Sequence, residues 1–189
     1  MSAQDSKLFV ISGPSGAGKG TLVTRVRERR SNLGLTVSAT TRAPRKGEVD
    51  GVNYFFLTRE EFDRRVANGE FVEWAEVHGN CYGTLVSEVQ SKLASGSSLI
   101  LEIDVQGALQ VKERFPEAVL IFIKPPSLDV LRERLVGRGT ETPETIELRM
   151  ANAAHELALA DRYDDVVVND DLDRATDELV RVLDMHERI

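Results

Sequence analysis

The sequence has few of the residues that disulfides, metal centres and membrane spans require. Its 189 residues include one cysteine and three histidines, and no apolar run is long enough to cross a membrane. A single thiol cannot form an internal disulfide, and the Cys and His residues do not cluster at the spacing of metal ligands. We therefore expect neither a Cys/His metal site nor a membrane span, and Cys81 as a small packed residue.

Positive charge is also in deficit. The 24 Lys and Arg residues face 31 Asp and Glu residues, which gives a formal net charge of −7. This balance argues against nonspecific binding to nucleic acid or to an anionic membrane, and it favours a small anion held in a local basic cleft. The polar start, Met1 to Ser6, leaves no room for a signal segment, so we expect a cytoplasmic protein, either a monomer or a homo-oligomer.

A glycine-rich run follows the first apolar segment, Leu8 to Ile11, and precedes a helical pattern. Its residues are Gly13, Pro14, Ser15, Gly16, Ala17, Gly18, Lys19, Gly20 and Thr21. Glycines let successive N–H groups turn toward one anion, the helix adds its positive end, and Lys19 reaches the outer phosphates. The run predicts a nucleoside triphosphate site. Thr21 stands one residue later than the usual magnesium-binding hydroxyl, and Gly20 occupies that position, so the run departs from the usual pattern at its metal ligand.

Strand and helix patterns alternate along the chain. Buried strands are predicted at 8–11, 35–38, 98–103, 119–123 and 166–168, and the first helix from Thr21 to about Arg30. This order predicts an α/β fold of the P-loop type, with three layers and a five-stranded parallel sheet. One domain is expected, with its core at about 5–38 and 96–189.

Two segments interrupt the alternation. Residues at about 39–95 predict an inserted mixed α+β lobe, with short strands at 53–57 and 71–77 and a helix whose capping box pairs Thr58 with Glu61. Phe62 is expected in the core of that lobe. Residues at about 134–149 predict a helical lid, in which Gly137 and Gly139 flank Arg138 and Pro143 opens a helix.

The lobe begins with two arginines beyond the end of a strand, and a tyrosine follows. Guanidinium groups bind phosphate oxygens with two donors, and a phenol adds a neutral donor. Arg42, Arg45 and Tyr54 are therefore candidates for a monophosphate site. Taken alone, the same residues also fit a solvated basic loop.

Several motifs together resemble the guanylate kinase family over nearly the whole chain. They are residues 40–57, 71–75, 82–84, 101–107, 138–141 and 168–171. The resemblance implies ATP on the glycine-rich run, with Arg134 and Asn169 beside it. It also implies GMP in the lobe, with guanine surrounded by one set of residues and its phosphate held by another: Ser38, Glu73, Thr84 and Glu102 for the base, and Arg42, Arg45, Tyr54 and Tyr82 for the phosphate.

The same resemblance implies phosphoryl transfer from ATP to GMP with Mg²⁺. Lys19, Arg42, Arg138 and Arg149 are the expected catalytic residues. Asp104 ends an apolar strand beside the phosphates, so it is expected to order water bound to magnesium, with Thr21 as a second candidate. Some family members have aspartate where this chain has Glu102, whose longer side chain changes the geometry.

Three other readings share parts of this pattern. A regulatory GTPase reads guanine with an Asn/Thr-Lys-x-Asp motif, and the run Asn169-Asp170-Asp171 lacks the lysine. A catalytically silent phosphopeptide-binding module of the same family resembles it with a degraded phosphate loop, whereas Lys19 and its glycines are intact here. Another nucleoside monophosphate kinase differs in whether Glu73 and Ser38 select guanine.

Overall fold

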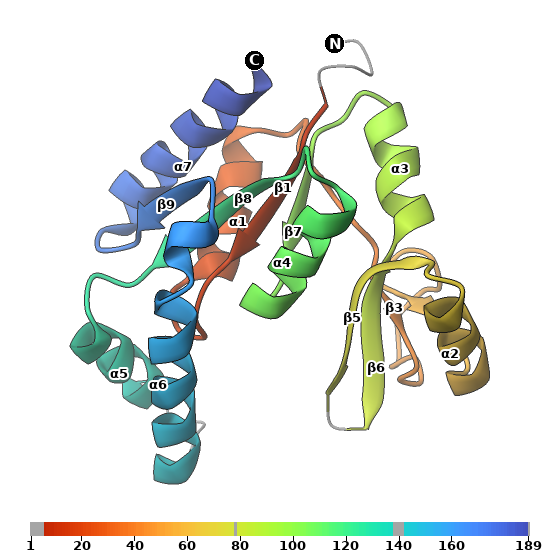
Figure 1. Cartoon of the computed structure of the whole chain (residues 1–189), viewed down its shortest axis with the longest axis horizontal. Coiled ribbons are helices and arrows are strands. Elements are labelled where there is room, and N and C mark those ends of the chain that lie inside the picture. Colours follow the sequence, from red (N-terminus) through yellow and green to blue (C-terminus); the bar gives the residue numbers. More distant parts are fainter. Residues whose placement is uncertain (1–5, 78, 138–141, 189) are drawn as a thin grey trace.

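In this computed structural model, which describes residues 6–77, 79–137 and 142–188, a parallel sheet occupies the centre of the chain (Figure 1). Its five strands are β1 (Leu8–Ser12), β2 (Gly34–Leu35), β7 (Leu99–Glu102), β8 (Val119–Lys124) and β9 (Asp165–Val168). Their order is β2-β7-β1-β8-β9, and every neighbouring pair is parallel. The predicted α/β fold and its five-stranded sheet are confirmed. All strands end at one edge, where loops after a parallel sheet place ligand sites.

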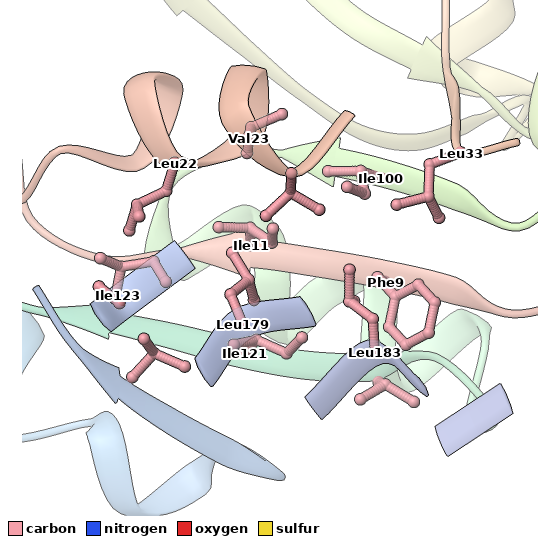
Figure 2. Packing of buried hydrophobic residues seen from close by; sticks show 14 of the residues in the cluster. Phe9, Ile11, Leu22, Val23, Leu33, Ile100, Ile121, Ile123, Leu179 and Leu183 are labelled. Atoms are coloured by element: carbon pink, nitrogen blue, oxygen red, sulfur yellow. The ribbon is translucent and has the colours of Figure 1, made fainter. Parts of the chain in front are cut away.

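Helices cover both faces of this sheet. On one face, α1 (Lys19–Arg29) and α7 (Leu172–Glu187) pack on Phe9 and Ile11 of β1, as Figure 2 shows. On the other, α4 (Val105–Arg114) and α3 (Val86–Ala94) pack around Leu8 and Val10. Burial on both faces explains why β1 is apolar at successive positions rather than alternating with polar residues.

A second, four-stranded sheet lies in the inserted lobe, with the order β4-β3-β6-β5. Its strands are β3 (Ala39–Thr40), β4 (Phe55–Phe56), β5 (Phe71–Val77) and β6 (Asn80–Leu85), and α2 (Arg59–Ala67) packs on them. Phe62 of α2 is fully buried and stacks on Phe71 with ring centroids 4.4 Å apart. Cys81 is fully buried in the same core, so the expectation of a packed residue is confirmed.

Two further helices extend from the carboxyl edge of the central sheet. They are α5 (Leu128–Gly137) and α6 (Pro143–Leu157), and a 3₁₀ helix (Ala160–Arg162) follows. Leu131 and Leu135 of α5 pack on Ile146 and Ala153 of α6. Pro143 opens α6 after the N-cap residue Thr142, as predicted. In Figure 1 this pair lies to the lower left of the central sheet and the inserted lobe lies to its right.

The strand predicted at 35–38 is wrong beyond its first residue, because β2 ends at Leu35. After that point the chain leaves the sheet for the lobe, and side chains of α3 satisfy its backbone. Glu88 Oε1 accepts from the Val37 N–H at 3.0 Å, and Lys92 Nζ donates to the Leu35 carbonyl at 2.5 Å. Local apolar character therefore extended the prediction into a segment that has left the central sheet.

Two other boundaries also differ. The strand predicted at 53–57 contains only Phe55 and Phe56, and α1 begins at Lys19 rather than at Thr21. Gly18, in a left-handed conformation with φ of 91°, ends the glycine-rich loop and starts the helix there. The lysine of the loop is thus already a helical residue.

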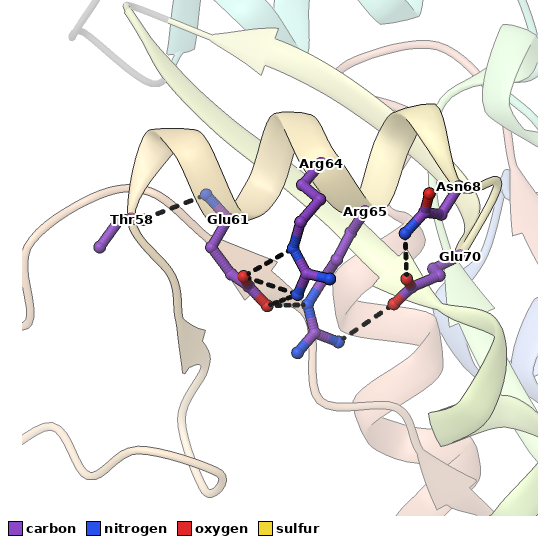
Figure 3. Close-up of polar contacts among 6 residues, drawn as sticks. All are labelled: Thr58, Glu61, Arg64, Arg65, Asn68 and Glu70. Carbon is purple, nitrogen blue, oxygen red and sulfur yellow. Dashed lines mark hydrogen bonds and ion pairs between the residues drawn. The ribbon is translucent and has the colours of Figure 1, made fainter.

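The capping box predicted at the start of α2 is half formed. The Glu61 N–H donates to Thr58 Oγ1 at 3.1 Å, which makes Thr58 the N-cap as predicted. The Glu61 carboxylate instead accepts from Arg64 and Arg65 (Figure 3). The two arginines, one turn further along, compete successfully for the carboxylate that a capping box would turn back to the N-cap.

Replacing Thr58 with alanine is expected to lower the free energy of unfolding by about 1 kcal/mol, because one N–H of the first turn of α2 loses its acceptor. Urea denaturation of the wild type and of Thr58→Ala measures this difference. Thr58→Ser keeps the hydroxyl and should stay within a few tenths of a kcal/mol of the wild type. Equal losses in both variants would show that the hydroxyl does not act as a cap.

Candidate active site

The loop between β1 and α1 depends on glycine at two places. Gly13 has φ of 142°, and a Cβ there would lie 2.2 Å from the Ile123 carbonyl oxygen. Gly18 has φ of 91°, and a Cβ there would lie 2.3 Å from Asn169 Nδ2. Both positions combine a left-handed conformation with a close neighbour, so no other residue fits without movement.

The start of α1 is open to an anion. Gly18 provides no side-chain cap, and the first turn of the helix has no acidic residue. The N–H groups of this turn and the positive end of the helix dipole therefore favour phosphate oxygens. Lys19 Nζ lies over the loop, where it donates to the carbonyls of Gly13 at 2.5 Å and Pro14 at 3.1 Å.

The residues predicted to hold ATP lie around this loop. The Arg149 guanidinium of α6 donates to Ser15 Oγ, and Asn169 Nδ2 donates to the Ala17 carbonyl at 2.8 Å. Arg134 of α5 donates to the Asn169 carbonyl at 2.8 Å. A pocket of about 360 Å³ opens beside them, lined by Gly16, Gly18, Thr21, Arg134, Asn169, Asp170 and Leu172. Arg138 lies outside the described residues.

Carboxylates face the loop from the end of β7. Glu102 lies beside α1, and its Oε1 is 3.6 Å from where a Cβ on Gly20 would be. Burial raises the pKa of the Glu102 carboxyl, and the charge of Lys19 acts in the opposite direction. Asp104 is the N-cap of α4 and accepts from the Gly107 N–H at 2.7 Å. Glu102 thus lies next to the start of α1, and Asp104 follows it at the start of α4.

The residues predicted to bind the acceptor phosphate lie in the inserted lobe. The Arg42 guanidinium carbon is 5.4 Å from the centre of the Tyr54 ring, and the Tyr54 and Tyr82 rings are 6.2 Å apart. Arg42 Nη2 donates to both carboxylate oxygens of Glu48, at 2.8 and 3.1 Å. Arg45 is exposed in the same loop, and its N–H donates to Glu48 at 2.6 Å. The structure thus brings Arg42, Tyr54 and Tyr82 together, with Arg45 at the rim.

The residues predicted to surround guanine come from adjacent strands. Thr84 Oγ1 of β6 donates to Glu73 Oε1 of β5 at 2.8 Å. Burial, followed by repulsion from Asp104, raises the pKa of the Glu73 carboxyl despite the hydrogen bond from Thr84. Ser38, half-buried, directly precedes β3, which pairs with β6. Glu73 is therefore a desolvated acceptor with one oxygen held in place.

The fold and these two sites define a class. A glycine-rich loop between the first strand and helix of a parallel sheet is a P-loop, and an inserted lobe carries a separate site with the groups that bind a phosphate. The arrangement is that of a P-loop protein that binds two phosphorylated ligands.

Comparisons with known proteins identify the family. Residues 5–186 match the family model described as guanylate kinase. The chain is 52% identical to the guanylate kinase of Halalkalibacterium halodurans, over 97% of this chain and 90% of that protein. It is 56% identical to the enzyme of Gloeobacter violaceus, over 94% and 87%. The crystal structure of guanylate kinase from Anaplasma phagocytophilum superposes with a TM-score of 0.71 at 36% identity, covering 96% of this chain and 86% of that one. The chain belongs to the guanylate kinase family.

Sequence reasoning gave no role to two carboxylates near these sites. Glu48 lies within the quoted lobe motif, and its spacing of six residues from Arg42 in a loop gave no signal of an ion pair. Glu156 of α6 lines a pocket of about 340 Å³ together with Asp104, and burial raises the pKa of its carboxyl. A half-buried carboxylate on a helix resembles a solvated one in sequence, so only the fold distinguishes them.

Replacing Gly18 with alanine is expected to abolish nucleotide binding by the loop. A methyl group would displace Asn169, which holds the Ala17 carbonyl, and would strain a left-handed residue. Titration with ATP by calorimetry should show an affinity at least tenfold weaker. Gly47→Ala is a matched control for the strain alone, because Gly47 has φ of 90° with no atom within 4 Å of a Cβ. Equal ATP affinity in the Gly18 variant would contradict this view of the loop.

Replacing Glu73 with glutamine is expected to raise the melting temperature of the ligand-free protein at pH 7. Because the folded-state pKa of Glu73 is raised, its ionised form opposes folding, and stability is lost as the pH rises through the interval between the unfolded and folded pKa values. The advantage of Glu73→Gln should therefore vanish below the unfolded pKa of a carboxyl. Thermal melts at pH 4 and pH 7 measure it, and an advantage equal at both pH values would exclude this origin.

Proposed function

We propose that this protein transfers the terminal phosphoryl group of ATP to GMP, giving ADP and GDP. The observation that carries the proposal is the second anion site, where Arg42, Tyr54 and Tyr82 lie together in the lobe. A P-loop alone fits many nucleotide-binding proteins, whereas a separate monophosphate site fits a kinase whose acceptor is a nucleotide. Membership of the guanylate kinase family supports the same assignment.

Guanine is the base whose hydrogen-bonding edge fits the lobe. Its N1–H and exocyclic amine are adjacent donors that one carboxylate accepts together, and its O6 accepts from a hydroxyl. Glu73 supplies the carboxylate and Ser38 the hydroxyl, with Thr84 holding Glu73 from the side. AMP would leave the Glu73 carboxylate unpaired, at a cost on the order of 2 to 5 kcal/mol, or roughly 30-fold to several thousand-fold in preference.

The triphosphate is assigned to the loop and the nucleoside to the adjacent pocket. Residues 13–21 surround the phosphates, and the pocket beside Arg134 and Asn169 has about 360 Å³ for the adenosine. Asn169 acts on the loop itself by holding the Ala17 carbonyl. Its contribution to ATP binding is thus to fix the shape of the loop as well as to line the pocket.

Magnesium fits the donors beside the loop. Within the described ranges no group of three or more Asp, Glu, His or Cys residues forms an all-protein metal site. Mg²⁺ is usually held by one or two carboxylates, waters and substrate phosphates, and the hard oxygens of Asp104 and Thr21 suit that mode. When bound, Mg²⁺ supplies neutralising charge to the phosphates.

The chain's own residues act by positioning and by charge. The attacking atom is a phosphate oxygen of GMP, which needs no general base because the second pKa of such phosphates is about 6. Lys19 neutralises the terminal phosphate of ATP, Arg42 orients GMP, and Arg149 reaches the loop from α6. Arg138 is assigned to the same lid on the family resemblance. Closure of the lobe and lid excludes water, which otherwise would accept the phosphoryl group.

The experiment is ADP formation from ATP and magnesium with GMP, AMP or no acceptor, using the wild type and Lys19→Ala. GMP-dependent turnover is expected, and the variant should lose about 10²- to 10³-fold because charge on the transferring group is no longer neutralised. Turnover with AMP would overturn the assignment of the base site. Tight binding of a phosphopeptide without turnover would favour the silent binding module instead.

A further inference from the structure

The segment that joins β2 to the inserted lobe, residues 36–38, is held at Val37 by a side chain of α3. Glu88 Oε1 accepts from the Val37 N–H at 3.0 Å, and Lys92 Nζ lies 2.8 Å from the same Glu88 oxygen. Lys92 also donates to the Leu35 carbonyl at 2.5 Å. One turn of α3 thus provides the acceptor and the donor that a neighbouring strand would provide.

This attachment ends one residue before Ser38. The Ser38 carbonyl accepts from the Phe55 N–H at 2.9 Å, so the chain is held by α3 at the Val37 N–H and by β4 at the Ser38 carbonyl. The Ser38 hydroxyl, by contrast, has no hydrogen-bond partner among the residues that the structure describes. A hydroxyl on a backbone that is already held in place can bond to a ligand atom with little loss of the protein's conformational entropy.

The anchor itself belongs to the central domain. Val86, Val89 and Leu93 of α3 pack in the core cluster that covers one face of the central sheet. The Glu88 side chain is 13% exposed, so its hydrogen bond to the Val37 N–H is largely shielded from water. A hydrogen bond to a charged acceptor that is shielded from water is stronger than a bond between two neutral groups at the surface. The residue before Ser38 is therefore held by a helix that packs on the central sheet, and Ser38 does not depend on the lobe alone for its position.

We propose that Glu88 is a positioning residue for GMP: it holds the N–H of Val37, the residue before Ser38, so that the Ser38 hydroxyl meets O6 of guanine. This inference rests on the proposed function and adds to it a residue that touches no substrate. Its effect is confined to the acceptor, because α3 and residues 36–38 have no contact with the ATP pocket beside Arg134 and Asn169. Glu88 thus contributes to acceptor affinity and leaves ATP binding unchanged.

The test is a double-mutant cycle on Glu88 and Ser38, read as KM for GMP, KM for ATP and kcat. Glu88→Ala is expected to raise KM for GMP about fivefold, the equivalent of one typical hydrogen bond, with KM for ATP and kcat unchanged. Glu88→Gln keeps an oxygen acceptor and should stay within about twofold of the wild type. Glu28→Ala, which removes an exposed carboxylate near the end of α1, is the matched control. In Ser38→Ala, the further change Glu88→Ala should add less than twofold, because the hydroxyl it positions is already absent.

Three outcomes would overturn the inference. They are an unchanged KM for GMP in Glu88→Ala, single-variant effects that multiply in the double variant, and an unchanged KM for GMP in Ser38→Ala. A rise in KM for ATP, or a fall in kcat, together with KM for GMP would show a general loss of structure and would also overturn it. Failure of the proposed function is distinct, because the wild type would then show no GMP-dependent turnover at all.

Discussion

The constraint on which the rest of the structure depends is the repulsion between two phosphorylated ligands that must touch. Near a protein surface, two unit charges of the same sign 4 Å apart repel by about 4 kcal/mol, and each ligand here carries more than one. The chain, with a net charge of −7, offsets this locally. It places the open start of α1 with Lys19 on one side and Arg42 with two tyrosines on the other. Lys19 follows a strand of the central sheet, whereas Arg42 follows a strand of the lobe sheet, so the proposed reaction needs both the central sheet and the lobe.

The same region also contains acidic residues, and burying one of them costs folding free energy. Glu73 is desolvated, and burial raises the pKa of its carboxyl, so the empty site holds a charge that opposes folding. Glu48 pairs with the Arg42 guanidinium, so an internal carboxylate holds the group proposed to bind the acceptor phosphate. Glu73 opposes folding whereas the Glu48 pair does not, because Arg42 lowers the pKa of the Glu48 carboxyl. A ligand with donors that match Glu73 would relieve its desolvation, so under the proposed function one buried carboxylate both costs stability and favours guanine.

The sequence predicted the parts of this design that are local. The glycines, Lys19 and the helix after them are contiguous, and the N-cap at Thr58 and the proline at the start of α6 depend on neighbouring residues alone. Side-chain partners across the fold were not predicted. The ion pair of Arg42 with Glu48 is set by the path of a loop, and the bond of Asn169 to the Ala17 carbonyl joins segments 152 residues apart. The order of residue types along the chain predicts neither the path of a loop nor the partner of a distant side chain.

The end of β2 shows why such errors are informative. Residues 35–38 have the composition of a strand, and the chain leaves the sheet at Leu35 because the lobe must be entered there. A backbone that leaves a sheet loses the partners of its N–H and C=O groups, which then pair with side chains or with water. Here two charged side chains of α3 do so, next to the residue assigned to the base. The strand pattern thus fails where the chain passes from the core to the lobe. If the same connection positions Ser38 as proposed, the packing of the core also affects which acceptor nucleotide binds.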